Sequence, residues 1–400
     1  MSVDQNPIAL DVVVIGGGVA GLWLLDALNR QGYRCVLLEA HQLGSGQTVA
    51  SQGILHGGMK YTLSNLIDPG AKAVAQMPLI WRDCLAGQAE PDLSQTKLRT
   101  DFCYLWRTGS ARSRFGMTGA RMVLRVKPTE IPQSDWPQAL NDLKGQVYNL
   151  PEQVLDTASF VADLASKHQE RLLKIDPENG LDFVRDQAGN VTAIQLTDAE
   201  KSLTLAPKHV VLTAGKGNAD LRAKLGLDDQ AMQIRPLHMV MVKGNLPKLN
   251  GHCTDFSQTR VTITTATAQD AQTVWTVGGQ VSEDGVKMTP EDLVKHAKRE
   301  ITAVVPNVDF TNAKWSTYRV DRAERKTASG RRPEGVTLLT EGNVITAWPT
   351  KLVLAPQLAM NVIQKLDMQP AGESVCIEDW PHPEVAPPPW ELPQNWMTLD

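Results

Sequence analysis

The stretch that decides the fold is Asp11–Glu39, which reads DVVVIGGGVAGLWLLDALNRQGYRCVLLE. It opens with a β-branched run, residues 12–15, which is typical of a strand buried on both faces. A glycine turn, an apolar helix and a second strand over residues 36–38 follow, and the stretch ends on an acidic residue. This order of strand, turn, helix, strand and acid predicts a βαβ unit that binds a dinucleotide.

Each part of this unit has a physical task in holding a dinucleotide. Gly16, Gly18 and Gly21 complete the pattern G-x-G-x-x-G. The first glycine permits a tight turn, the second lets the backbone approach a pyrophosphate, and the third lets the helix pack closely on the strand. The positively polarised N-terminus of the helix then faces the phosphates. Glu39 follows the glycines at a distance where a carboxylate can bind the ribose hydroxyls.

Length and composition limit the classes of protein that this chain can belong to. A chain of 400 residues with 42% hydrophobic residues predicts two lobes with packed interiors. The net charge is −4 and the basic residues are spread out, so no nucleic-acid partner is expected. The N-terminus lacks the pattern of a signal peptide, and no apolar run approaches the roughly 20 residues that a membrane-spanning helix needs.

Five cysteines lie far apart and none forms a C-x-x-C pair. This pattern argues against a disulfide framework, a zinc site and a redox-active cysteine pair, and predicts reduced thiols in a cytoplasmic protein. No cluster of His, Cys and Asp has metal-ligand spacing, so no metal site is expected, and no G-x-S-x-G motif indicates a hydrolase.

Hydrophobic periodicity and breaker residues predict the order of the elements. Asp156 or Thr157 is expected to cap a helix that runs to about His168, and Thr289 to cap a helix with Pro290 at its first position. Other helices are expected over residues 71–85, 110–126 and 351–366, strands over residues 97–106, 208–214 and 344–348 and through most of 233–281, and a turn at 284–285.

This organisation predicts an α/β fold with a Rossmann-like domain that is discontinuous in sequence. An inserted domain, made of a mostly antiparallel β-sheet with helices, is expected to bind the substrate. We assign residues 1–85, 150–225 and 330–378 to the nucleotide-binding domain, residues 86–149 and 226–329 to the substrate domain, and residues 379–400 to an extended C-terminal tail.

Four stretches carry a resemblance to a known family. They are GGGVAGLWLL with LLEA near the N-terminus, GSGQTVASQGILHGGMKY at 44–61, HVVLTAGKGNADL at 209–221, and the segment from WSTYRVD to LVLAPQLA at 315–359. In this order they resemble the flavoproteins related to D-amino-acid oxidase, glycine oxidase, sarcosine oxidase and glycerol-3-phosphate dehydrogenase. The second stretch is closest in character to the glycerophosphate and 2-hydroxyglutarate dehydrogenases, and the fourth aligns best with glycine oxidase.

The resemblance implies that the dinucleotide is FAD. A second glycine- and serine-rich loop after Glu39 suits the longer body of FAD, although a solvated flexible loop is the alternative interpretation. Gly215 can let the backbone approach the cofactor or can simply end a strand. The implied cofactor-binding residues are Gly16, Gly18, Val19, Ala20, Gly21, Glu39, Ala40, Gln47, Thr48, Ser51, Gln52, Gly53, Ile54, Leu173, Ala214, Gly215, Trp348, Pro349, Thr350, Lys351 and Leu352.

Two residues are candidates for catalysis. Lys351 aligns where members of the family surround the N1 and O2 edge of the flavin, and a cation there stabilises the reduced flavin. A solvated lysine in the first turn of a helix is the alternative. His56 lies in ILHGG beside the expected flavin ring and can act as a base or orient the substrate, because its pKa is near neutral. A structural hydrogen bond is an equal alternative.

The substrate is expected to be a small anion. Arg319 aligns with the arginine of glycine oxidase that the resemblance assigns to the substrate carboxylate, and a planar guanidinium suits this role. An ion pair that only supports the structure is the alternative. Tyr318, Met59 and Tyr61 are expected to line the substrate site, whereas His238 is expected to be structural.

The sequence therefore predicts an FAD-dependent oxidoreductase. The preferred reaction is oxidation of an amino acid or secondary amine at its C–N bond, with hydride transfer to flavin N5. The first alternative is a 2-hydroxyacid or glycerol-3-phosphate-type dehydrogenase that passes electrons to a quinone, which the SQGILHGGMKY stretch favours. The second is a non-catalytic flavoprotein or partner subunit. The sequence does not decide between oxygen and a quinone as the electron acceptor.

Overall fold

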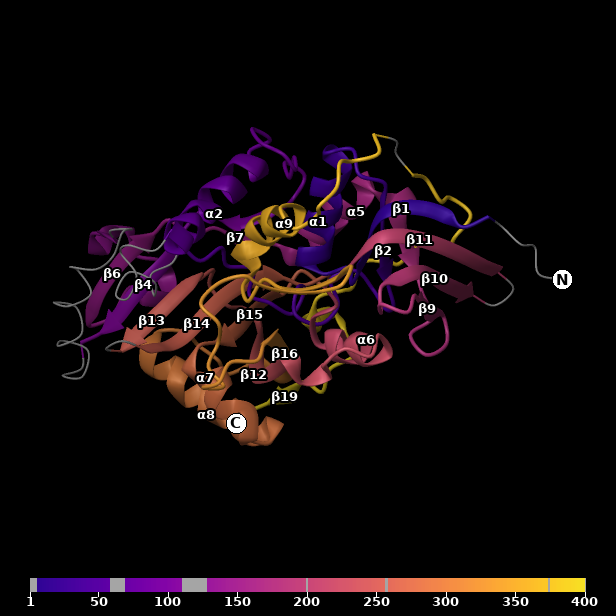
Figure 1. Ribbon diagram of the computed structural model, residues 1–400. Helices are drawn as coiled ribbons and strands as arrows, with labels where there is room; N and C mark the ends of the chain where they lie inside the picture. Colours follow the sequence, from indigo (N-terminus) through magenta and orange to yellow (C-terminus); the bar gives the residue numbers. More distant parts are fainter. Residues whose placement is uncertain are drawn as a thin grey trace.

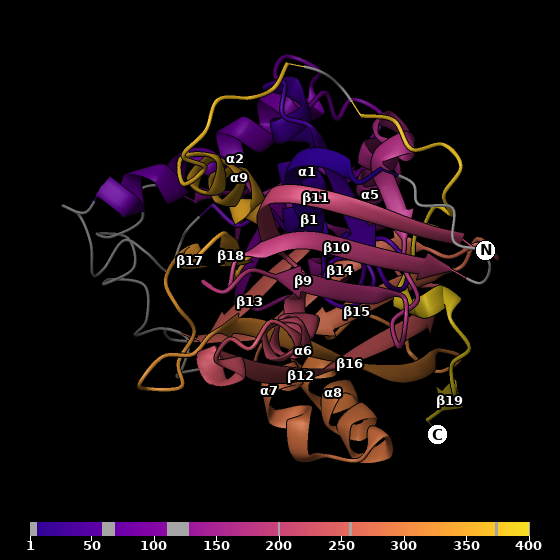
Figure 2. The same cartoon turned by 45° about the vertical axis from the view of Figure 1, so that its right-hand side comes forward.

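The computed structural model describes residues 6–57, 69–109, 128–198, 201–255, 258–372 and 375–399. Two large sheets form its framework, and helices cover the outer face of each (Figure 1). Figure 2 shows α1, α5 and α9 above the first sheet, and α7 and α8 below the second. The mixed α/β architecture predicted from the sequence is confirmed.

The first sheet has eight strands among the described residues. Its main path runs β17-β18-β11-β1-β2-β8, and the β10–β9 hairpin is attached to β11. Along this path β18, β11, β1, β2 and β8 pair with one another in parallel, whereas the edge strand β17 is antiparallel to β18. The strands are β1 (Ile8–Ile15), β2 (Cys35–Glu39), β8 (Leu172–Lys174), β9 (Leu181–Arg185), β10 (Val191–Asp198), β11 (Lys201–Leu212), β17 (Thr337–Glu341) and β18 (Val344–Trp348).

The first strand is buried on both faces, as its β-branched run predicts. Val12, Val13 and Val14 are completely buried. Val12 and Val14 belong to the core beneath α1 (Val19–Arg30), while Val13 belongs to the core on the opposite face. β1 also runs parallel to β2 and β11. The carboxyl ends of these strands therefore lie at one edge of the sheet, where the glycine turn begins.

Helices pack on both sheets according to their apolar faces. Asp156 accepts a hydrogen bond from the backbone N–H of Ser159, and Thr289 accepts one from Asp292, so both predicted N-caps are confirmed. The helices are α1, α2 (Pro69–Leu85), α5 (Thr157–Lys167), α6 (Asn218–Lys224), α7 (Gln280–Asp284), α8 (Pro290–Val304) and α9 (Ala355–Ile363).

The second sheet has nine strands in the part of the chain that the structure describes. Its order is β19-β16-β12-β15-β14-β13-β4-β6-β5, and β13 is parallel to β4 while all other neighbouring strands in this order are antiparallel. The strands are β4 (Cys103–Thr108), β5 (Thr129–Glu130), β6 (Gly145–Leu150), β12 (Met232–Gly244), β13 (Gly251–Asp255), β14 (Gln258–Thr267), β15 (Thr273–Gly278), β16 (Lys314–Arg325) and β19 (Met397–Thr398).

Three local expectations need correction. Residues 97–106 do not form one strand: β3 (Leu98–Thr100) pairs with β7 (Val154–Leu155), and β4 begins separately at Cys103 in the second sheet. The expected turn at 284–285 is instead the junction of α7 with a 3-10 turn, Gly285–Lys287. The last helix begins at Ala355 rather than at Lys351. The helix expected at 110–126 lies outside the described residues.

The C-terminal segment crosses from one sheet to the other. Trp380 donates a hydrogen bond to the carbonyl of Lys174 near the first sheet, and β19 pairs with β16 in the second. Trp390 is also buried, so this tail packs against the body of the protein. None of the helices in the described ranges is long and apolar enough to cross a membrane.

Candidate active site

The glycine turn lies where β1 ends and is packed too tightly for side chains. Gly16 has φ +112°, and a Cβ there would lie 2.5 Å from the Cα of Ala214. A Cβ at Gly21 would collide with the carbonyl oxygen of Gly16. Gly18 is the N-cap of α1 and has no side chain that caps the helix. Gly18 therefore places no side chain of its own between the helix N-terminus and an approaching anion, although the N–H of Val19 already donates to Thr48 Oγ1.

Glu39 is joined directly to this turn. Its Oε2 accepts the N–H of Gly17 at 2.6 Å, and its Oε1 accepts the N–H of His41 at 2.8 Å. The residue lies at the carboxyl end of β2 and is buried. Leu173 is in the adjacent strand β8, paired with Leu38. A carboxylate has further lone pairs beyond these two bonds, so this placement suits the hydroxyls of a ribose.

The loop after Glu39 is held between the two sheets rather than left in solvent. Thr48 Oγ1 accepts the N–H of Val19 at 3.0 Å, which ties the loop to the start of α1. Gln52 Nε2 donates to the carbonyls of Thr262 and Thr276 in the second sheet, at 3.2 and 2.9 Å. The alternative of a solvated flexible loop is therefore wrong for residues 43–57.

The end of β11 completes the turn from the other side. Thr213 Oγ1 donates to the carbonyl of Gly16 at 2.9 Å, and the N–H of Ala214 donates to Asn218 Oδ1 at 2.9 Å. Gly215 has φ +59°, and a Cβ there would face Gln47 Oε1 at 3.8 Å. The middle segment thus lies beside both the glycine turn and the second loop.

Lys351 is positioned by a strained turn after β18. Thr350 has φ +60°, a conformation that β-branched residues rarely adopt, and its hydroxyl donates to the carbonyl of Gly335 at 3.3 Å. Lys351 itself is extended, with φ −147°, and caps a 3-10 turn, Leu352–Leu354, that leads into α9. It is therefore not in the first turn of an α-helix, which corrects that alternative.

Lys351 lies near a group of three polar side chains that the sequence did not suggest as a set. His56 Nδ1 is 3.3 Å from Glu152 Oε2, and His252 Nε2 is 3.4 Å from the same oxygen. Glu152 and His252 are buried, whereas 45% of the His56 side chain is exposed. We call His56, Glu152 and His252 the His–Glu–His cluster.

The charges in this cluster influence one another. Burial raises the pKa of Glu152, but the interactions with His56 and His252 outweigh burial and leave that pKa below its usual value. Desolvation by the surrounding protein lowers the pKa of His56, and His252 and Lys351 lower it further. The charge and hydrogen bond of Glu152 oppose this change. The lowered pKa of His56 favours the neutral imidazole, the form that can accept a proton.

Arg319 and Tyr318 point in opposite directions because side chains alternate along a strand. Tyr318 donates through its hydroxyl to the carbonyl of Ala50 at 3.0 Å, so it faces the second loop. Arg319 is exposed and donates to the carbonyl of Val286, next to α7. The structure thus separates Arg319 from the His–Glu–His cluster. Met59 and Tyr61 lie outside the described residues.

We expect Arg319→Ala to change the KM for an anionic substrate by less than about twofold, since surface substitutions rarely have larger effects. The same change should leave the amount of bound FAD unaltered. Steady-state kinetics and the visible absorbance of the purified variant test this. A large rise in KM with unchanged kcat would restore Arg319 as the substrate anchor.

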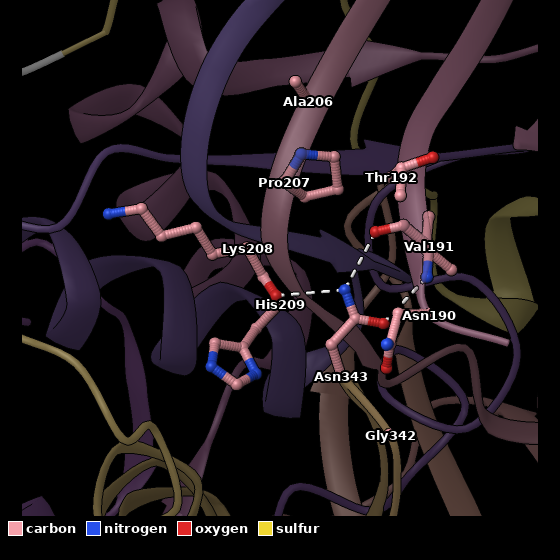
Figure 3. Close-up of a pocket in the computed structure, with 9 residues that line it drawn as sticks. All are labelled: Asn190, Val191, Thr192, Ala206, Pro207, Lys208, His209, Gly342 and Asn343. Carbon is pink, nitrogen blue, oxygen red and sulfur yellow. Dashed lines mark hydrogen bonds between the residues drawn. The ribbon is translucent and has the colours of Figure 1, made fainter. Parts of the chain in front are cut away.

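A surface hollow elsewhere in the first sheet does not adjoin these residues. Figure 3 shows its lining, where the side chain of Asn343 joins β10 to β11. Asn343 Nδ2 donates to the carbonyls of Val191 and Lys208, and its Oδ1 accepts the N–H of Val191. The polar atoms of this amide already have protein partners, so the hollow is explained by the strand junction.

Comparison with known proteins agrees with this geometry. The model of the FAD dependent oxidoreductase (DAO) family matches residues 11–350. A Pseudomonas aeruginosa protein described as a probable FAD-dependent oxidoreductase is 38% identical over 393 residues, covering 96% of this chain and 98% of that one. The crystal structure of that FAD dependent oxidoreductase superposes with a TM-score of 0.82 at 35% identity, and covers 97% of this chain and 99% of its own.

Two more distant structures share the fold. Glycine oxidase from Geobacillus kaustophilus has a TM-score of 0.60 at 18% identity, covering 90% of this chain and 95% of that one. Glycerol-3-phosphate dehydrogenase from Bacillus halodurans, complexed with FAD, has a TM-score of 0.55 at 16% identity, covering 92% and 65%. The family match and the near full-length relative show that this chain belongs to the FAD dependent oxidoreductase (DAO) family, and that it is an enzyme whose cofactor is FAD.

Proposed function

We propose that this enzyme oxidises a small anionic substrate at a carbon that carries a hydroxyl group, as in a 2-hydroxy acid or a polyol phosphate. The observation that carries the proposal is the imidazole of His56 beside the buried carboxylate of Glu152, with Nδ1 and Oε2 3.3 Å apart. An alcohol that loses a hydride from carbon must also lose its hydroxyl proton, and this proton needs a base. A neutral imidazole backed by a carboxylate is such a base.

The residues around the glycine turn fit FAD. Gly16 and Gly21 leave no room for side chains, and the start of α1 offers backbone N–H groups to a pyrophosphate. Glu39 would hold the ribose, and Thr48 and Gln52 would hold the loop along the cofactor. When bound, FAD accepts the hydride from the substrate and passes electrons to the acceptor.

The protein's own residues then have separate tasks. His56 takes the hydroxyl proton of the substrate on Nε2, while Glu152 holds Nδ1 of the same ring. Lys351 supplies positive charge, which attracts an anionic substrate and stabilises negative charge at the flavin. Its effect on the pKa of His56 supports placing this charge near the base.

Oxidation of an amine at its C–N bond is the competing reaction. A neutral amine can lose a hydride without a base, so the His56–Glu152 pair would have no required task in it. The arginine that a glycine-oxidase-like enzyme would use for the carboxylate aligns with Arg319, which faces α7 instead. These two observations favour a hydroxyl substrate over an amine.

The test is to mix the oxygen-free holoenzyme with matched substrate panels and record bleaching of the yellow flavin absorbance. One panel contains 2-hydroxy acids and polyol phosphates, and the other contains amino acids and N-methyl amino acids. We expect only members of the first panel to bleach the flavin. Bleaching by an amine and by no hydroxyl compound would overturn the proposal. Reoxidation of the bleached enzyme by oxygen or by a soluble quinone then identifies the acceptor.

We expect Lys351→Met to lower the midpoint potential of bound FAD, because the reduced, more negative flavin loses a stabilising cation. A tenfold loss of stabilisation corresponds to about 30 mV for a two-electron couple. Equilibration with redox dyes measures the potential. Lys208→Met is the control, since Lys208 is paired with Asp11 and 61% of its side chain is exposed. Equal potentials for wild-type and Lys351→Met would place Lys351 away from the flavin.

A further inference from the structure

The His–Glu–His cluster contains a carboxylate that no local sequence pattern accounts for. Glu152 follows β6 and lies next to an apolar group that includes Ile54, Cys103 and Val154. Burial raises the pKa of the Cys103 thiol, and the nearby negative charge of Glu152 raises it further. A charge in such a place is costly unless its oxygens are paired.

The oxygens of Glu152 do have partners, and two of them belong to the segment that contains His56. Oε1 accepts the backbone N–H of Gly57, the residue after His56, at 2.7 Å. Oε2 faces Nδ1 of His56 at 3.3 Å. One carboxylate thus contacts both the ring of His56 and the backbone of the next residue. Such a pair of contacts fixes the orientation of the imidazole.

His252 occupies the remaining side of the carboxylate. Its Nε2 is 3.4 Å from Oε2 of Glu152 but makes no aligned hydrogen bond, while its Nδ1 is 2.9 Å from Thr262 Oγ1. The two imidazole rings are 5.6 Å apart between centroids. Only 6% of the His252 side chain is exposed, so this imidazole is a buried neighbour of the Glu152 carboxylate.

We propose that Glu152 is the positioning residue for His56. Its carboxylate accepts the Nδ1–H of His56, which leaves the lone pair of Nε2 free to take a proton. When the substrate hydroxyl loses its proton, the O–H bond breaks and an N–H bond forms at Nε2. The Nδ1–H stays on the ring, and the resulting imidazolium is paired with Glu152. The role of His56 as a base rests on the proposed function. The position of the proton on its ring can be tested without that function.

Among the residues that the structure describes, the charged and titratable groups that act on His56 are Glu152, His252 and Lys351. Glu152 raises the pKa of His56, whereas His252 and Lys351 lower it. The proposal therefore predicts two pKa changes of opposite sign. Removing the negative charge of Glu152 should lower the pKa of His56 further. Removing the positive charge of Lys351 should raise it. A residue that only supports the fold would produce neither change.

The test reads the ring of His56 directly by long-range ¹⁵N–¹H NMR of the histidine-labelled holoenzyme. We expect wild-type His56 to carry its proton on Nδ1 when neutral. In Glu152→Gln we expect loss of this tautomer preference and a lower pKa, and in Lys351→Met a higher pKa with the tautomer kept. His56→Asn identifies the signal by its loss.

Asp26→Asn is the matched control. Asp26 is a buried residue of α1, and its Oδ1 lies 3.0 Å from Nε2 of the buried His168. Like Glu152→Gln, this variant should have a lower free energy of unfolding. It should leave the NMR signals of His56 unchanged. If Glu152→Gln proves unstable, Lys351→Met and the wild-type tautomer still test the proposal.

Three results would overturn the inference. The first is a wild-type His56 protonated on Nε2, and the second is an unchanged pKa in both variants. The third is about one equivalent of a divalent metal per purified chain whose removal by EDTA changes the His56 signals, since the three ligand atoms lie within 4.8 Å of one another. None of these results depends on substrate turnover, so they are separate from a failure of the substrate panels.

With a substrate from the panels, the pH dependence of kcat/KM provides a second reading. The active form of His56 is the neutral one, so the rate rises with pH through its pKa. Glu152→Gln should therefore move this acidic limb to lower pH and reduce kcat on the order of 100-fold. Lys351→Met should move the limb to higher pH. A reduced kcat with an unmoved limb would assign Glu152 a purely structural part.

Discussion

Gly21→Val should give a folded protein that is purified without its yellow cofactor. Gly21 lies in the first turn of α1, and even a single Cβ there would collide with the carbonyl oxygen of Gly16 and lie 2.8 Å from Thr213 Oγ1. The helix must then move away from the end of β1, and the turn that would hold the pyrophosphate widens. Overpacking of this kind costs about 1–3 kcal/mol or more.

The measurement is the ratio of flavin to protein absorbance after purification, followed by titration with added FAD. We expect the affinity to fall on the order of 100-fold or more, because about 1.4 kcal/mol corresponds to each factor of ten. Gly335→Val is the control, since a Cβ at Gly335 meets nothing within 4 Å. A Gly21→Val protein that retains a full complement of FAD would show that the cofactor is not held by this turn.

The fold around this turn was predictable because its signals are local. Asp11–Glu39 contains both strands, the glycine turn and the helix within one continuous stretch. The caps at Asp156 and Thr289 were equally readable, since an N-cap bond joins residues three positions apart. The βαβ unit and both N-caps were predicted correctly because each depends on interactions within one short segment.

Predictions failed where the outcome depended on backbone geometry that a pattern does not show. The apolar residues after Lys351 suggested a helix from that position. The chain instead makes a positive-φ turn at Thr350 and a 3-10 turn, and Pro356 stands in the first turn of α9. The carbonyl and side-chain contacts of that turn, not hydrophobic spacing, determine where Lys351 lies.

The His–Glu–His cluster could not have been found from spacing. Glu152 is 96 residues from His56, and His252 is further along the chain. They meet because the end of β6 and the start of β13 flank the start of β4, while the backbone N–H of Leu55 donates to the carbonyl of Gln153. This pairing is a property of the whole second sheet, so the individual residues carried no signal beyond the chemistry of their side chains.

Arg319 shows that an alignment alone does not reveal which face of a sheet a side chain occupies. A shift of one position along β16 moves a side chain to the other face of the sheet. Tyr318, next to it, reaches Ala50 in the second loop, while Arg319 reaches Val286. The alignment selected Arg319, and the structure adds which face of β16 carries its side chain.

His56→Asn should reduce kcat by about 10²–10⁴-fold, the usual contribution of a general base, while FAD remains bound. The asparagine amide can still donate to Glu152 from near the former Nδ1 position, so the carboxylate keeps a partner. Nothing replaces Nε2, so the substrate proton has no acceptor.

Rapid-mixing measurement of flavin bleaching with a hydroxyl substrate reports the loss at the step itself, and added imidazole should restore part of the rate. His238→Asn is the control, because His238 bonds Gly285 and Thr317 on the far face of the second sheet. A variant that bleaches as fast as the wild type would remove His56 from the chemistry and return the amine reaction to first place.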